Sequence, residues 1–153
     1  MTRAERAVAL HRAGSACSQA VFSVFAQDLG LDERAAHRIA GGFGGGIGRQ
    51  GLTCGAITGG IMALSLALGS SEASDQDAKL RLYRIVSDYM TRLKGLHGSL
   101  ECRTLLEGAD LWTQEGRDMV AARNLSEKVC NPLIERAVIE AEAILREAGK
   151  LEG

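Results

Sequence analysis

The sequence predicts an all-α protein in which several helices pack into one compact domain. Aromatic residues make up 4% of the 153 residues, and runs of alternating valine, isoleucine and threonine are missing. The residue types that favour strands are therefore scarce. Apolar residues recur instead at steps of three and four, the period of an amphipathic helix. We expect six to eight helices, with a glycine-rich loop leading into a central apolar helix.

The N-terminal part of the chain divides into three helical segments. The first covers about residues 3–13. The second covers about residues 15–29 and ends at Gly30, because glycine commonly follows the last turn of a helix. A third begins after Asp32, whose side chain can cap a helix N-terminus, and ends at Gly41.

The middle of the chain combines a loop with two longer helices. The stretch of residues 41–51 is mostly glycine, which loses the most backbone freedom on ordering, so we expect a loop there. An apolar helix follows over about residues 53–68. It is shorter than the about 20 residues of a membrane span, which predicts a buried core helix. The longest helix covers about residues 75–96.

The C-terminal part predicts a short helix over about residues 102–106, another over about 113–123 and a last one over about 132–148. Asn131 is the expected N-cap of the last helix, with Pro132 at the first helical position. No internal repeat or linker divides the chain. We therefore expect one domain over residues 1–153.

Composition narrows the classes of function. The formal net charge is -1 and no basic stripe is visible, which argues against a nucleic-acid surface. The polar N-terminus does not resemble a secretory signal, and we expect a cytoplasmic protein with no membrane association. Thiols are kept reduced in that compartment, so static disulfides are not expected. A homodimer fits a small chain whose apolar helices exceed what one core can cover.

Residues 46–51, Gly-Ile-Gly-Arg-Gln-Gly, match the dinucleotide-binding fingerprint by letter. The context differs, because that fingerprint follows a strand and here a predicted helix precedes it. Two interpretations remain open: a flexible connection, or a loop that wraps a reactive Cys54 or admits a partner to it. If the loop binds a cofactor, the candidate residues are Gly46, Gly48 and Arg49.

The chain has four cysteines, Cys17, Cys54, Cys102 and Cys130, and no two are close in sequence. The short Cys-x-x-Cys pairs of zinc ribbons and ferredoxin-type clusters are therefore missing. Free cysteine is often just a small buried apolar residue. All four, however, fall at or next to predicted helix starts, where backbone N–H groups and the helix dipole favour a thiolate.

Several short segments follow one another in a characteristic order: Cys17-Ser-Gln-Ala-Val, Gly44-Gly-Gly-Ile-Gly-Arg, Thr53-Cys-Gly-Ala-Ile-Thr-Gly-Gly, Glu101-Cys-Arg-Thr-Leu-Leu and Cys130. This arrangement resembles the family of redox-active proteins named for its pattern C_GCAxxG_C_C. The most specific part is the block from Cys54 to Gly59, and Thr53 stands where the pattern has glycine. The resemblance implies that the four cysteines act together in a redox role. A related four-cysteine pattern holds an iron–sulfur cluster in some cytochromes.

Gly55 and Gly59 lie one helical turn apart in the apolar helix. Together with Ala56 and Gly60 they leave one side of that helix nearly bare, so another helix can pack against it at short range. Such packing would help bring cysteines from separate helices to one place.

Three functions follow as hypotheses. The first is a thiol redox protein, by dithiol–disulfide exchange or electron transfer, which as an enzyme would be a thiol oxidoreductase acting on a redox partner protein. Cys54 would attack, and Cys17, Cys102 or Cys130 would resolve the disulfide. The second is a binding module in which the same four cysteines hold an iron–sulfur cluster or zinc. The third is a helical partner protein with inert buried cysteines.

Overall fold

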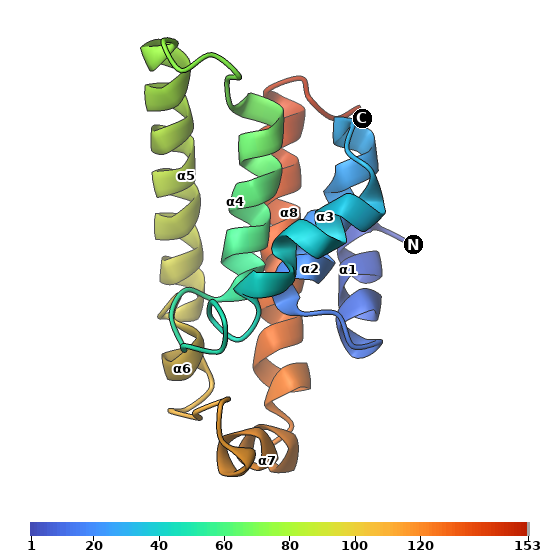
Figure 1. Ribbon diagram of the computed structural model, residues 1–153, viewed down its shortest axis with the longest axis vertical. Helices are drawn as coiled ribbons and strands as arrows, with labels where there is room; N and C mark the ends of the chain where they lie inside the picture. Colours follow the sequence, from blue (N-terminus) through green and yellow to red (C-terminus); the bar gives the residue numbers. More distant parts are fainter. Residues whose placement is uncertain (153) are drawn as a thin grey trace.

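Eight α-helices make up most of residues 1–152, the part of the chain that the computed structural model describes (Figure 1). Within those residues no strand is present, and an isolated antiparallel bridge joins Thr53 to Glu101. The all-α prediction is confirmed. The helices are α1 (Arg3–Arg12), α2 (Cys17–Ala26), α3 (Glu33–Ala40), α4 (Gly55–Leu68), α5 (Gln76–His97), α6 (Cys102–Leu105), α7 (Gln114–Ala122) and α8 (Asn131–Glu147).

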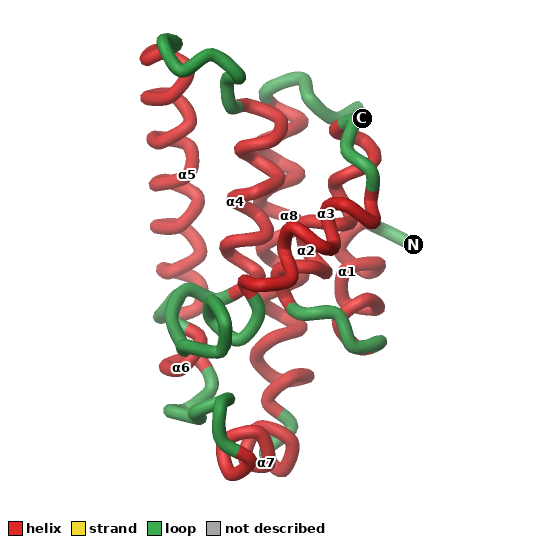
Figure 2. The backbone as a smooth tube through the Cα atoms, viewed as in Figure 1, coloured by secondary structure: helices red, strands yellow, loops and turns green. Residues whose placement is uncertain are grey.

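Helix boundaries agree with the predicted ones to within a few residues because their caps are local. The side chain of Asp32 accepts a hydrogen bond from the Ala35 N–H at 3.0 Å. Gly30 takes the left-handed conformation, with φ 83°, after a short 3₁₀ turn (Gln27–Leu29). A second 3₁₀ turn (Gly41–Phe43) opens the stretch predicted as loop, and the remainder, residues 44–51, has no regular structure (Figure 2).

The predicted start of the last helix is wrong in one respect. A π-helical turn (Ser126–Cys130) runs directly into α8, and Cys130 has helical backbone angles of φ -64° and ψ -48°. Asn131 is consequently the first residue of α8 and does not cap it. Its side chain is free to bond elsewhere.

The main core surrounds α2, of whose ten residues eight are buried. Helices α1, α3 and α4 pack directly on α2, and α8 packs on both α1 and α4. Helix α5 covers the outer side of α4 (Figure 1). A second, smaller hydrophobic cluster lies at the end of the molecule that holds α6 and α7. Its buried members are Cys102, Leu106, Ala109 and Leu125.

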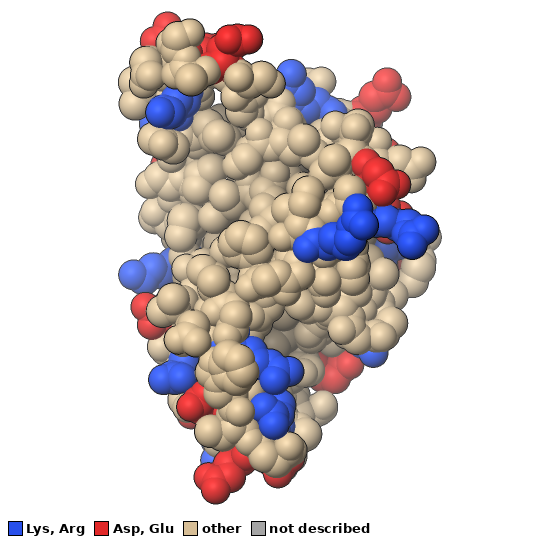
Figure 3. All heavy atoms as spheres, viewed as in Figure 1, with Lys and Arg blue, Asp and Glu red and all other residues tan. Residues whose placement is uncertain are grey.

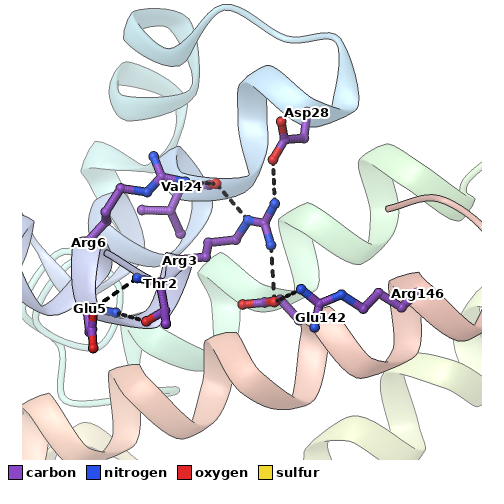
Figure 4. Close-up of polar contacts among 8 residues, drawn as sticks. All are labelled: Thr2, Arg3, Glu5, Arg6, Val24, Asp28, Glu142 and Arg146. Carbon is purple, nitrogen blue, oxygen red and sulfur yellow. Dashed lines mark hydrogen bonds and ion pairs between the residues drawn. The ribbon is translucent and has the colours of Figure 1, made fainter. Parts of the chain in front are cut away.

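Arg3 fastens α1 to two other helices (Figure 4). Its Nε donates to the Val24 carbonyl oxygen at 3.1 Å, and its guanidinium pairs with Asp28 next to α2 and, at 3.2 Å, with Glu142 of α8. The guanidinium also lies 5.1 Å from the centre of the Phe25 ring. The N-terminal helix is thereby fixed against the helix that begins with Cys17.

The surface mixes charges of both signs. Figure 3 shows acidic and basic side chains interspersed on the visible face, without a broad patch of one sign. Among the described residues, none of the helices combines the length and the apolar character that crossing a bilayer requires.

Candidate functional site

All four cysteines line a single cavity of about 220 Å³. Cys17 and Cys54 belong to the main hydrophobic core, whereas Cys102 and Cys130 belong to the smaller cluster. The cavity therefore lies where the two clusters meet. Residues that are far apart in sequence come together there, as the hypothesis of concerted action requires.

Close packing of α2 on α4 brings Cys17 to Cys54. A Cβ atom on Gly55 would come within 2.8 Å of the Ser18 nitrogen and 3.2 Å of the Cys17 Cβ, and one on Gly59 within 2.7 Å of the Ser18 carbonyl oxygen. Real Cβ atoms do not approach backbone atoms so closely. The predicted bare side of this helix is confirmed, and its function is to let the two cysteine-bearing helix starts meet.

Backbone pairing brings Cys54 to Cys102. On either side of the bridge between Thr53 and Glu101, the Cys54 N–H donates to the Leu100 carbonyl oxygen and the Cys102 N–H to the Leu52 carbonyl oxygen, both at 2.7 Å. In an antiparallel pair this register puts residues 54 and 102 on the same face. These two paired backbone segments therefore place the Cys54 and Cys102 thiols on the same side, where both line the cavity.

The glycine-rich loop forms an ordered left-handed turn. Five consecutive residues from Gly45 to Arg49 have positive φ angles, between 55° and 73°. Backbone hydrogen bonds close the turn, including those from the Gly51 and Leu52 N–H groups to the Gly45 and Gly46 carbonyl oxygens. The turn needs its glycines because every L-residue with a side chain is strained in this conformation.

The loop residues predicted to bind a cofactor do not line the cavity. Gly46 is buried, and a Cβ atom there would come within 2.7 Å of the Cys102 Cβ. Gly48 and Arg49 are exposed on the outside of the turn. The loop residue that does line the cavity is Gly45. The loop's role at the site is therefore to pack against Cys102 and to form part of the wall.

The pKa values of Cys54 and Cys17 are shifted in opposite directions. A hydrogen bond from the Cys17 thiol lowers the pKa of Cys54, and the N–H groups of Ala56 and Ile57 at the start of α4 lower it further against the opposing effect of burial. Interactions with Cys130 and Cys54, together with burial, raise the pKa of Cys17 well above its ordinary value. With the pKa of Cys54 lowered and that of Cys17 raised, Cys54 loses its proton before Cys17 does.

The remaining two cysteines differ from this pair. Burial, followed by the neighbouring Cys54 and Cys130, raises the pKa of Cys102 to about 12. Arg103 opposes this shift only weakly, since its side chain is half exposed and paired with Asp110 at 3.5 Å. Cys130 is not at a free helix start as predicted, because the π turn continues into α8. It instead lines the cavity next to Cys17, whose pKa it raises.

A histidine and an asparagine that the sequence did not single out complete the site. His11 lines the cavity, and its Nε2 lies 3.6 Å from the Cys17 Sγ. Its Nδ1 lies 2.7 Å from Oδ1 of Asn131, a residue 120 positions away in sequence. No spacing rule connects such residues. The one available hint was a polar residue, Asn131, directly following Cys130.

The side chains do not form a metal-binding group. Within residues 1–152, no set of three or more His, Cys, Asp or Glu residues has an arrangement suited to a metal ion. All four cysteines are free thiols that share a cavity without surrounding one centre. The interpretation of the four cysteines as ligands of an iron–sulfur cluster or zinc ion gains no support from this arrangement, and no step below involves a metal.

The profile of one protein family, described as "Putative redox-active protein (C_GCAxxG_C_C)", matches residues 15–144. The chain belongs to this family. Neither the curated proteins nor the solved structures contain a significant match. The four cysteines of this C_GCAxxG_C_C protein are the four that line the cavity.

Proposed function

We propose that this C_GCAxxG_C_C protein is a thiol oxidoreductase whose Cys54 and Cys17 cycle between dithiol and disulfide inside the cavity. What supports this most directly is that Cys17 and Cys54 line one cavity where α2 packs closely on α4, and that the Cys17 thiol there lowers the pKa of Cys54. A thiolate is the form of cysteine that attacks a disulfide, and a second thiol in contact with it is what resolution requires.

The reaction proceeds in two exchanges. The Cys54 thiolate attacks one sulfur of a substrate disulfide, forming a mixed disulfide and releasing the first substrate thiol. The Cys17 sulfur then attacks the Cys54 sulfur, forming the Cys17–Cys54 disulfide and releasing the second substrate thiol. Two electrons pass from the two protein sulfurs to the substrate disulfide. The first substrate thiolate takes its proton from solvent, and the second takes the proton that Cys17 loses, so that the substrate becomes two thiols.

The walls of the cavity favour a small uncharged substrate. Apart from the cysteines, His11 is the one ionisable side chain in the lining. Most of the remaining lining side chains are apolar, namely Leu105, Leu106, Leu111, Val120, Val129 and Leu133. A charged disulfide would lose its hydration there without gaining a partner.

Because all four thiols are free, we further propose that the protein works in a reducing compartment such as the cytoplasm.

The test is to treat the reduced native protein with dithiodipyridine, a neutral aromatic disulfide, and to count the remaining thiols. The expected result is loss of two of the four thiols, with Cys17 linked to Cys54 on peptide mapping. Cys17→Ser is expected to stop at the mixed disulfide on Cys54. The proposal is wrong if the native protein keeps all its thiols or if the linked pair is any other than Cys17 and Cys54.

Anaerobic purification with metal analysis and a visible spectrum tests the alternative in the same preparation. A colourless protein without bound iron or zinc is the expected result. Stoichiometric metal that blocks all four thiols would contradict the dithiol mechanism and favour the binding module.

A further inference from the structure

Resolution of the mixed disulfide requires a base. In the resting site the Cys17 thiol donates its proton to neighbouring sulfur, and the pKa of Cys17 is raised. Once Cys54 is bound in a mixed disulfide, it no longer offers a thiolate to accept that proton. The hydrogen bond with Cys130 remains, and it raises the pKa of Cys17, which keeps the proton on Cys17. A protonated thiol is a poor nucleophile, so Cys17 has to transfer its proton to another group before it can attack.

Apart from the cysteines, the one ionisable side chain that lines the cavity is His11. Its Nε2 lies 3.6 Å from the Cys17 Sγ, within hydrogen-bonding distance for sulfur. Its other ring nitrogen, Nδ1, lies 2.7 Å from the Asn131 Oδ1. An amide oxygen only accepts hydrogen bonds, so Nδ1 carries the ring hydrogen and the lone pair of Nε2 faces the thiol.

Asn131 has an arrangement that packing alone does not explain. The residue is 5% exposed, and its Nδ2 is buried with no hydrogen-bond partner within 3.5 Å among the described residues, although the Asn131 side chain lies close enough to Glu127 to help lower the pKa of that carboxyl. An unpaired buried donor destabilises the folded state. The amide nevertheless holds its oxygen toward His11, which fixes the ring tautomer that presents Nε2 to Cys17.

We propose that His11 accepts the Cys17 proton during resolution of the mixed disulfide and that Asn131 is the residue that positions the His11 ring. As the Cys17 S–H bond breaks, an N–H bond forms at Nε2 and the Cys17 sulfur bonds to the Cys54 sulfur. The bond between Cys54 and the substrate sulfur breaks, and the departing thiolate takes the proton from the imidazolium. This inference rests on the proposed function.

The experiment is a stopped-flow reaction of the intact protein with dithiodipyridine, in which each exchange releases one equivalent of absorbing thione. The wild type is expected to show two phases, from Cys54 and then Cys17. His11→Ala should leave the first phase within about twofold and slow the second by at least about a hundredfold, the lower end of general-base effects. Added imidazole should restore the second phase, whereas pyrazole, which has the same shape but is not basic at neutral pH, should not.

The positioning role of Asn131 is tested by comparing the rate of the second phase with the rate of the first. Asn131→Ala should slow the second phase without slowing the first, and Asn131→Asp, which keeps an acceptor oxygen, should recover most of the rate. Circular dichroism checks the fold of each variant, and His11→Gln replaces His11→Ala if the latter unfolds.

The two proposals fail in different ways. An unchanged second phase in the His11 variants, or equal rescue by pyrazole, overturns the role of His11 while leaving the Cys54–Cys17 exchange intact. Release of fewer than two equivalents of thione by the wild type overturns the exchange itself, and the role of His11 with it.

Discussion

Gly59 of α4 lies directly against Ser18 of α2, so that a methyl group at position 59 would come within 2.7 Å of the Ser18 carbonyl oxygen. Ser18 is the residue after Cys17, and α4 starts immediately after Cys54. The separation of these two helices therefore sets the separation of the two sulfurs. The lack of a side chain at Gly59 therefore affects both the packing of α2 on α4 and the chemistry of the two thiols.

Gly59→Ala is expected to lower the free energy of unfolding by about 1–3 kcal/mol, the usual effect of overpacking in a core. It should also slow formation of the Cys17–Cys54 disulfide, because α2 and α4 must move apart. Urea denaturation and the dithiodipyridine reaction measure the two effects.

Gly95→Ala is the matched control, since a Cβ at this site in α5 meets nothing within 4 Å. That variant should be stabilised by up to about 1 kcal/mol, as for an exposed helical glycine. Equal effects at both positions would contradict the packing role of Gly59.

Cys54 and Cys102 are similarly buried, at 5% and 8% exposure, but their protonation differs. A lowered pKa gives Cys54 thiolate at a pH where an ordinary thiol is protonated, whereas the pKa of Cys102 is raised to about 12. Iodoacetamide should therefore modify Cys54 before Cys102 throughout the range of about pH 6 to 10 that brackets an ordinary thiol. Mass spectrometry of the alkylated peptides gives both rates. Faster modification of Cys102 would show that access rather than charge controls reactivity.

Glu142 and Asp28 both pair with Arg3, but the Glu142 side chain is 11% exposed and that of Asp28 is 51% exposed. Glu142 also pairs with Arg146 at 2.8 Å. Glu142→Gln should lower stability by about 1.5–3 kcal/mol, as for loss of buried hydrogen bonds to a charged group. Asp28→Asn should change stability by less than about 1 kcal/mol, because solvent screens an exposed ion pair. Thermal denaturation of both variants tests this difference, and similar losses would count against it.

Gly60 lies under the ring of Tyr89, whose hydroxyl donates to the Ala137 carbonyl oxygen at 2.8 Å. A methyl group at position 60 would collide with that hydroxyl, so Gly60→Ala is expected to destabilise the fold. Tyr89→Phe removes the hydroxyl and should lose about 1 kcal/mol by itself. The double variant should lose less stability than the sum of the two, with a coupling of about 0.5–3 kcal/mol. Strict additivity in urea denaturation would contradict direct contact.

Helix positions follow from the sequence because their signals are local. Asp32 caps α3 and Gly30 ends the turn before it with backbone angles that glycine adopts readily. Close packing of another helix on α4 could also be predicted, because Gly55 and Gly59 share one helix face, but the sequence did not identify that helix as α2. These features depend on residues within a few positions of one another.

The rest of the site depends on long-range convergence. Asn131 satisfies every sequence rule for an N-cap, yet the π turn before it extends the helix and sends its side chain to His11. Likewise, the glycines of the loop indicate flexibility by composition, but hydrogen bonds to later residues order them into a left-handed turn that includes Ile47 and Arg49. No local preference encodes either outcome.

The cavity lies between hydrophobic clusters of very different size. In the described part of the chain the main core buries twenty-five apolar residues and the smaller cluster four. Stability is distributed unevenly in such a molecule, and the less extensive unit opens with the smaller free-energy change. Backbone amides of residues 102–130 should therefore exchange with deuterium faster than those of α2 and α4, measured by mass spectrometry. Local opening of the smaller cluster would expose the sulfurs to a substrate, while Cys17 and Cys54 stay in place on α2 and at the start of α4.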